Sequence, residues 1–261
     1  MTAPAALIVD AVTVRFAGIT ALDRVSFAVG TCLIHAVIGP NGAGKSTLFN
    51  VVSGAYRPAA GSVRFRDADL TRLSPCRIAG LGVARTFQNI ALMPHETVEE
   101  NLMLGRHQLT TAGFITAGLR LPRARREEAR HRARAREIAA FVGLAGKLDV
   151  AAGALAYGDQ KRVEIARALC VEPDLLLLDE PAAGMNAYET AVVAHLIRDI
   201  RDDLQIAILL VEHDMGLVMG IADRVTVLDF GRRIADGTPD EVQRDPAVQL
   251  AYLGTEGEAD Q

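Results

Sequence analysis

The chain has 261 residues, of which 50% are hydrophobic and 23% charged, an ordinary composition for a globular protein with a substantial core. Its formal net charge of −4 argues against nucleic acid as the main partner. Three scattered cysteines lack metal-binding or redox spacing and the N-terminus lacks the positive flank of a signal peptide, so we expect an intracellular protein with reduced thiols. The longest stretch without Lys, Arg, Asp or Glu lies between Arg24 and Lys45, and its glycines and Pro40 exclude a membrane helix.

The N-terminal part of the chain is predicted to form mainly β-strands, because β-branched and aromatic residues gather there between Gly, Asp and Pro. The segments predicted on this basis are residues 7–16, 24–29 and 62–65. Residues 33–38 form a short apolar run that ends before Gly39, as expected of a buried strand. Residues 45–53 follow as a predicted helix with Gly54 after its end.

The middle of the chain, residues 89–156, is predicted to be mostly helical, with prolines and glycines dividing it into short helices and a loop. Strand and helix patterns alternate after it. The apolar runs at residues 175–178 and 206–211 show no polar alternation, which is typical of strands covered on both faces of a parallel sheet.

The C-terminal part is predicted to contain a hairpin of residues 224–229 and 232–236. A last helix should follow, with Thr238 at its N-cap, Pro at the first helical position and Glu241 at the third. Residues 255–261 are predicted to form a loose tail.

A glycine-rich segment between the predicted strand and helix matches the phosphate-binding loop G-x-x-x-x-G-K-[ST]. It reads Gly39-Pro40-Asn41-Gly42-Ala43-Gly44-Lys45-Ser46-Thr47. Glycines let successive backbone N–H groups turn toward phosphate oxygens, and the helix N-terminus adds positive potential. Lys45 can bind the β and γ phosphates, and the Ser46 hydroxyl can ligate Mg²⁺. The segment therefore predicts that the chain binds a nucleoside triphosphate.

Two adjacent carboxylates, Asp179 and Glu180, end the apolar run of residues 175–178. Such a pair alone is more often a helix cap. With a phosphate loop upstream, we expect Asp179 to hold Mg²⁺ through its water shell and Glu180 to polarise an attacking water.

The segment before these carboxylates resembles the signature of the ABC ATPase superfamily. It reads Leu155-Ala156-Tyr157-Gly158-Asp159-Gln160-Lys161-Arg162-Val163-Glu164-Ile165-Ala166-Arg167-Ala168-Leu169. Gly158 is predicted to precede a helix with one apolar face, formed by Val163, Ala166, Leu169 and Cys170. The resemblance implies that Ala156, Tyr157 and Gly158 contact the γ-phosphate of an ATP held by a second protomer, at a helix N-terminus that attracts anions.

Further segments resemble the superfamily in the same order along the chain. The resemblance implies that Phe16 stacks on adenine and that Gln88 contacts Mg²⁺ and water and signals to a membrane subunit. It also implies that His213 contacts the γ-phosphate, although a lone histidine at a strand end is more often structural. The resemblance also implies that residues 183–186 form the loop that faces the partner's nucleotide site.

Two positions depart from the superfamily pattern. Ala156 stands where Ser is usual, which removes a hydroxyl contact to the γ-phosphate. Asn186 stands where Asp is usual, which keeps hydrogen bonding but loses a charge. Neither change removes a metal ligand or the expected base, so hydrolysis is still expected.

A finer resemblance covers nearly the whole chain and points to the first of the two ATPase subunits of branched-chain amino acid importers. Its segments are Ala84-Arg85-Thr86-Phe87-Gln88-Asn89, Thr97-Val98-Glu99-Glu100-Asn101-Leu102, Pro181-Ala182-Ala183-Gly184 and Ala251-Tyr252-Leu253-Gly254. Within that group Ala156 is an unsurprising variant. ATPases of urea or amide importers and of lipopolysaccharide export share part of this pattern, so they remain alternatives.

The resemblance implies an α/β fold, the P-loop NTPase fold of ABC ATPases, with a mixed sheet and a β-rich N-terminal portion. One domain of residues 1–261 is expected, with its nucleotide-binding core at 1–88 and 157–254 and a helical subdomain inserted at 89–156. The implied cofactors are ATP and Mg²⁺. The implied partners are a second ATPase subunit, identical or paralogous, two integral membrane permease subunits and, indirectly, a substrate-binding protein. The chain would then lie peripherally on the cytoplasmic face of the inner membrane.

Two rival functions remain open. A soluble ABC ATPase acting on nucleic acid or the ribosome usually carries long coiled coils, zinc modules or two cassettes, and none is visible in this sequence. A nucleotide-sensing regulatory subunit with slow turnover is the other.

Two features outside these motifs have plainer interpretations. Arg126, Arg130 and Arg134 share a face of a predicted helix, which is more often a solvated face than a contact with anionic lipid or a permease. His35 lies in an apolar strand and is expected to be a core histidine with satisfied hydrogen bonds.

Overall fold

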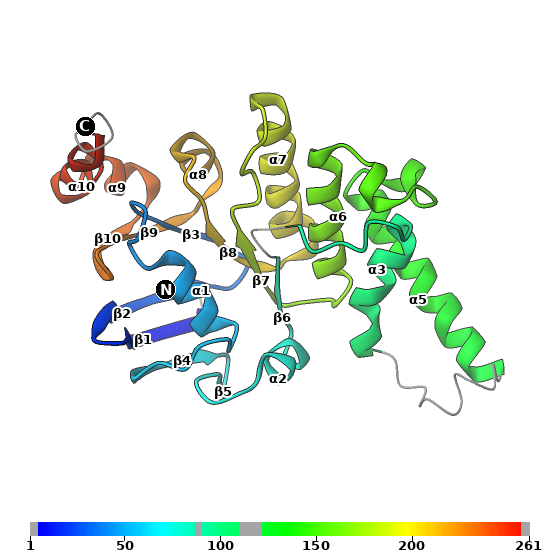
Figure 1. Cartoon of the computed structure of the whole chain (residues 1–261), viewed down its shortest axis with the longest axis horizontal. Helices are drawn as coiled ribbons and strands as arrows, with labels where there is room; N and C mark the ends of the chain where they lie inside the picture. Colours follow the sequence, from blue (N-terminus) through cyan, green and yellow to red (C-terminus); the bar gives the residue numbers. More distant parts are fainter. Residues whose placement is uncertain (1–4, 87–89, 110–121, 257–261) are drawn as a thin grey trace. The chain divides into compact units, whose positions relative to one another are not determined.

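A computed structural model of the chain describes residues 5–86, 90–109 and 122–256 (Figure 1). The chain forms two compact units. The first comprises residues 1–85 and 174–261, and the second comprises residues 86–173. The second unit therefore extends beyond the helical segment expected at 89–156, because the signature helix belongs to it.

A six-stranded sheet carries the chemistry of the first unit, in the order β10-β9-β3-β8-β7-β6. Its strands are β3 (Ile34–Ile38), β6 (Val83–Arg85), β7 (Leu175–Asp179), β8 (Ala207–Val211), β9 (Arg224–Asp229) and β10 (Arg232–Gly237). All neighbours pair in parallel except β9 and β10, which form the predicted antiparallel hairpin. Every residue of β3, β7 and β8 is buried, so the apolar runs are confirmed as strands covered on both faces.

A second, antiparallel sheet of the first unit has the order β2-β1-β4-β5. Its strands are β1 (Ala5–Phe16), β2 (Ile19–Gly30), β4 (Ala60–Phe65) and β5 (Ala68–Asp69), so the three predicted N-terminal strands are confirmed. Helix α1 (Lys45–Val52) shares one hydrophobic core with both sheets. That core includes Val9, Phe27 and Val63 from the antiparallel sheet, Phe49 from α1, and Leu177 and Leu209 from the parallel strands.

The remaining helices of the first unit are α2 (Pro75–Gly80), α7 (Ala187–Leu204), α8 (Met215–Ile221), α9 (Pro239–Arg244) and α10 (Pro246–Glu256). Helix α9 begins with the predicted capping box, in which Thr238 accepts from the backbone N–H of Glu241 and Glu241 accepts from that of Thr238. Helix α10 includes Thr255 and Glu256, so the start of the expected loose tail is helical. Residues 257–261 of that tail lie outside the described residues.

The second unit is mainly helical. Its elements are α3 (Val98–Arg106), α5 (Pro122–Phe141), α6 (Tyr157–Leu169) and the 3-10 helices η1 (His107–Leu109), η2 (Ala145–Lys147) and η3 (Ala152–Ala154). Arg126, Arg130 and Arg134 are exposed on α5, as predicted for a solvated face. Within the ranges that the structure describes, no helix is both long and apolar enough to cross a membrane.

Candidate functional site

The phosphate loop joins the end of β3 to the start of α1, as the sequence predicts. Gly39, Gly42 and Gly44 have positive φ angles of 148°, 80° and 100°. A Cβ atom on Gly39 would lie 2.0 Å from the carbonyl oxygen of Leu228, and one on Gly44 would lie 2.7 Å from that of Ala21. Only glycine fits at these two positions, because both the backbone conformation and the close approach of β9 and β2 exclude a side chain.

Lys45 is the first residue of α1, and its side chain folds back over the loop. Its Nζ donates to the carbonyl oxygens of Gly39 at 2.6 Å and Pro40 at 2.9 Å. Burial lowers the pKa of Lys45, and the nearby Glu180 opposes this shift. The loop thus holds a cation beside backbone amides at a helix N-terminus, which is the arrangement that binds phosphate.

Asp179 and Ser46 supply oxygen atoms that suit a magnesium ion. Asp179 ends β7 and is 3% exposed, while Ser46 is exposed in the first turn of α1. Mg²⁺ is commonly bound by one or two protein oxygens together with waters and substrate phosphates. Among the described residues, no cluster of three or more His, Cys, Asp or Glu side chains could hold a metal by itself. The predicted ligand Gln88 lies outside the described residues.

Glu180 follows β7 and lies directly beside His213. Its Oε1 is 2.6 Å from Nε2 of His213, which follows β8. Glu180 has a left-handed φ of 48°, a conformation that costs about 1–3 kcal/mol for a residue other than glycine. Its backbone N–H donates to the carbonyl of Val211 at 2.9 Å, so the turn is tied to the neighbouring strand. The two residues predicted to act on water and γ-phosphate therefore form a pair.

Glu212 is a further residue of this site that the sequence interpretation missed. It is 3% exposed, and its carboxylate accepts from the backbone N–H groups of Ala182 at 2.8 Å and His213 at 3.1 Å. Burial raises the pKa of Glu212. It links the turn after Glu180 to the turn that carries His213. An acidic residue directly after a wholly apolar strand was the signal that could have identified it.

The signature residues lie in the second unit. Ala156 is the N-cap of α6, and its methyl side chain can make no cap hydrogen bond. The prediction that Gly158 precedes the helix is wrong, because the helix begins at Tyr157, two residues earlier than expected. Val163, Ala166, Leu169 and Cys170 are buried, which confirms the apolar face. Tyr157 is 43% exposed, and with Gly158 it forms the first turn of this helix.

Phe16 ends β1 with 43% of its surface exposed, as a side chain that stacks on a base requires. Its ring meets that of Tyr56 edge to face, with the centroids 5.2 Å apart.

Asn186 caps α7 by accepting from the backbone N–H of Glu189 at 3.0 Å, and Glu189 accepts in return from that of Asn186 at 3.1 Å. Asn186 therefore has a structural role that needs no negative charge.

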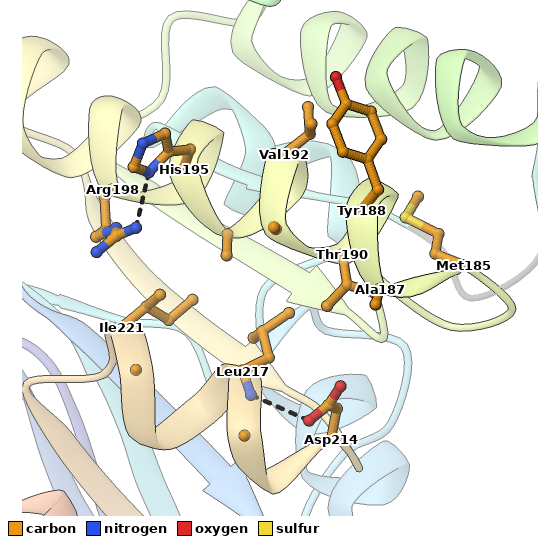
Figure 2. Close-up of a pocket in the computed structure, with 14 residues that line it drawn as sticks. Met185, Ala187, Tyr188, Thr190, Val192, His195, Arg198, Asp214, Leu217 and Ile221 are labelled. Carbon is orange, nitrogen blue, oxygen red and sulfur yellow. Dashed lines mark hydrogen bonds between the residues drawn. The ribbon is translucent and has the colours of Figure 1, made fainter.

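An open groove of ≈ 750 Å³ lies between α7 and α8 in the first unit (Figure 2). At one end of the groove, Asp214 accepts from the backbone N–H of Leu217 at 3.0 Å. At the other end, Nη2 of Arg198 lies 2.7 Å from Nδ1 of His195. None of the residues assigned to the phosphate site lines this groove. It is therefore separate from the loop of residues 39–47.

Known protein families match two segments of this chain. The family described as "ABC transporter" matches residues 22–183, and the family described as "Branched-chain amino acid ATP-binding cassette transporter" matches residues 232–258. The chain is 43% identical to the high-affinity branched-chain amino acid transport ATP-binding protein LivG of Salmonella typhimurium, over 95% of this chain and 97% of that protein. It is 40% identical to BraF of Pseudomonas aeruginosa, described in the same words, over 94% and 96% of the two chains.

A solved structure has the same fold. It is the ADP conformation of an ATP-binding cassette of an ABC transporter, 31% identical in sequence, with a TM-score of 0.84 over 96% of this chain and 99% of that chain. The predicted α/β fold is therefore confirmed.

Proposed function

Because this chain belongs to the family of ATP-binding proteins of ABC transporters, we propose that it binds and hydrolyses ATP for an importer of branched-chain amino acids. The observation that carries this proposal is the Glu180–His213 pair at 2.6 Å, at the end of the sheet from which the phosphate loop also emerges. The cargo is supported by the identity to two branched-chain amino acid transport proteins along nearly their whole length.

The residues of the first unit divide the work of hydrolysis. The backbone amides of residues 39–47 and the ammonium of Lys45 bind the phosphates. Ser46, Gln88 and Asp179 would hold Mg²⁺, which when bound neutralises charge on the phosphate oxygens. Glu180 accepts a proton from the attacking water, and His213 orients Glu180 and contacts the γ-phosphate.

The second unit completes the site of another protomer. The first turn of α6, with Ala156, Tyr157 and Gly158, offers its N–H groups to the γ-phosphate that the other protomer binds.

Other contacts complete the proposed assembly. Phe16 stacks on adenine, a contact that needs only an exposed aromatic face. Two such subunits, identical or paralogous, work with two membrane permeases and a substrate-binding protein. The subunit then lies on the cytoplasmic face of the inner membrane.

Replacement of Glu180 by Gln tests this mechanism. We expect Glu180→Gln to keep ATP binding and to lower the steady-state hydrolysis rate by about two to four orders of magnitude, the usual contribution of a general base. Phosphate release measures the rate, and calorimetry measures ATP affinity. Glu137→Gln, at an exposed position on α5, is the matched control and should hydrolyse ATP normally. Near-normal hydrolysis by Glu180→Gln would remove Glu180 as the base.

The cargo needs a separate measurement. Co-purification of the chain with its membrane subunits, followed by reconstitution in vesicles, allows uptake of leucine and urea to be compared. ATP-dependent uptake of leucine is expected. Uptake of urea without leucine would contradict the proposed cargo and leave the ATPase assignment intact.

A further inference from the structure

Arg85, the last residue of β6, connects the expected metal carboxylate to helix α1 within the first unit. Its Nη2 donates to Oδ2 of Asp179 at 2.8 Å. Its Nη1 donates to Oδ1 of Asn50 and to Oγ of Ser53, each at 2.8 Å. Asn50 lies in the last turn of α1 and Ser53 is its C-cap. One guanidinium therefore contacts two elements that both contribute to the phosphate site.

This connection is largely withdrawn from water. The side chains of Arg85 and Asp179 are 13% and 4% exposed, and the guanidinium carbon lies 5.7 Å from the ring centroid of Phe49. Charged hydrogen bonds at such sites are strong and geometrically specific. Only the planar guanidinium offers several donors in a rigid fork, so a lysine at position 85 could not reach the same acceptors together.

The position of the connection matters for metal binding. Helix α1 carries Ser46 in its first turn and is held by Arg85 at its other end, while β7 ends in Asp179. Arg85 thus fixes the carboxylate of Asp179 with respect to the helix that carries the Ser46 hydroxyl. Mg²⁺ demands nearly ideal octahedral geometry and usually keeps several of its waters, so a small displacement of a group that holds the ion or those waters weakens its binding.

We propose that Arg85 is a positioning residue that sets the Mg²⁺ affinity of the site by holding Asp179 against α1. The proposal rests on the proposed function, because it takes Asp179 as one of the residues that hold Mg²⁺, through its water shell. Arg85 acts through Asp179 and is not required by the loop amides or Lys45. Nucleotide binding without metal should therefore not depend on it.

The experiment is a Mg²⁺ titration of ATP hydrolysis, paired with calorimetry of ATP binding in EDTA. Removal of a group that orients a metal ligand typically weakens metal binding by about 10- to 100-fold. We expect Arg85→Gln to raise the half-saturating Mg²⁺ concentration by about tenfold and to leave ATP affinity in EDTA unchanged. Arg85→Lys should fall between Arg85→Gln and the parent chain.

Arg66→Gln is the matched control, because it removes another ion pair, one that lies just before β7. Arg66 pairs with Asp174, just before that strand, at 3.0 Å, and both side chains are half exposed. This control should leave the Mg²⁺ dependence unchanged.

The double variant Asn50→Ala/Ser53→Ala keeps the ion pair between Arg85 and Asp179 but removes the hydrogen bonds of Arg85 to α1. It tests the proposal if Arg85→Gln fails to fold. A raised Mg²⁺ requirement with unchanged binding in EDTA supports the proposal. An unchanged or lowered Mg²⁺ requirement overturns it, as does an equal loss of ATP affinity in EDTA, which would indicate general structural damage. Failure of the parent chain to hydrolyse ATP would instead contradict the proposed function.

Discussion

Three ionisable side chains of the phosphate site already have protein partners. Lys45 donates to two loop carbonyls, Asp179 pairs with Arg85, and Glu180 pairs with His213. Buried charges are costly unless they are paired, so these contacts stabilise a site rich in charge. The partners of Lys45 are neutral carbonyls. We therefore expect its ammonium to exchange them readily for the stronger attraction of a phosphate.

Lys45→Ala should weaken ATP binding itself. A hydrogen bond to a charged group contributes about 1.5–3 kcal/mol, so the dissociation constant should rise by about 10- to 100-fold. Calorimetry measures this constant directly. Lys147→Ala, in the second unit, is the control and should bind ATP normally. Unchanged affinity in Lys45→Ala would contradict the assignment of the phosphate loop.

Strand β3 contains a buried histidine, and burial disfavours its charged form. His35 is 1% exposed, and its Nε2 lies 2.8 Å from Oγ1 of Thr226 in β9. Nδ1 has no hydrogen-bond partner among the described residues, so the expectation of a fully satisfied histidine is confirmed only in part. Burial lowers the pKa of His35 to about 4 from the ordinary 6.5.

This depressed pKa predicts a loss of stability in acid. Below pH 6.5 the unfolded chain takes up a proton at His35, but the folded chain does so only near pH 4. The free energy of unfolding is therefore at its full value above pH 6.5, and it falls by about 3 kcal/mol as the pH drops toward 4. Urea denaturation at several pH values should show that His35→Gln loses less stability over this interval than the parent chain. The exposed His95→Gln serves as control, and equal losses in all three chains would disprove the explanation.

In the proposed mechanism, the assembly of two protomers depends on residues from both units. The phosphate loop and the Glu180–His213 pair belong to the first unit, and the exposed first turn of α6 belongs to the second. In the proposed mechanism a phosphate held by one protomer is contacted by the signature residues of the other. Bound, unhydrolysed ATP should therefore hold two protomers together.

Glu180→Gln makes this association measurable. Light scattering after gel filtration should show a dimer of this variant with ATP and a monomer without nucleotide. Adding Gly158→Asp should abolish the dimer, since a carboxylate in the first turn of α6 would repel the phosphate. A monomer of Glu180→Gln at saturating ATP would contradict the transport-motor mechanism.

Features that depend on residues close together along the chain could be predicted from the sequence. The phosphate loop, the buried strand before Asp179 and the capping box at Thr238 each depend on neighbouring residues, whose backbone preferences fix the outcome. The roles expected of Phe16 and His213 came from the resemblance. Two local boundaries were wrong, since α6 begins at Tyr157 and α10 extends to Glu256.

Contacts between distant residues required the folded chain. Arg85 and Asp179 are 94 positions apart, Glu180 and His213 are 33 apart, and Glu212 and Ala182 are 30 apart. These pairs meet because β6, β7 and β8 are neighbours in the parallel sheet, and strand order depends on packing of the whole core. The amino-acid order thus specified which chemical groups the site contains. The packed sheet specified which of them touch.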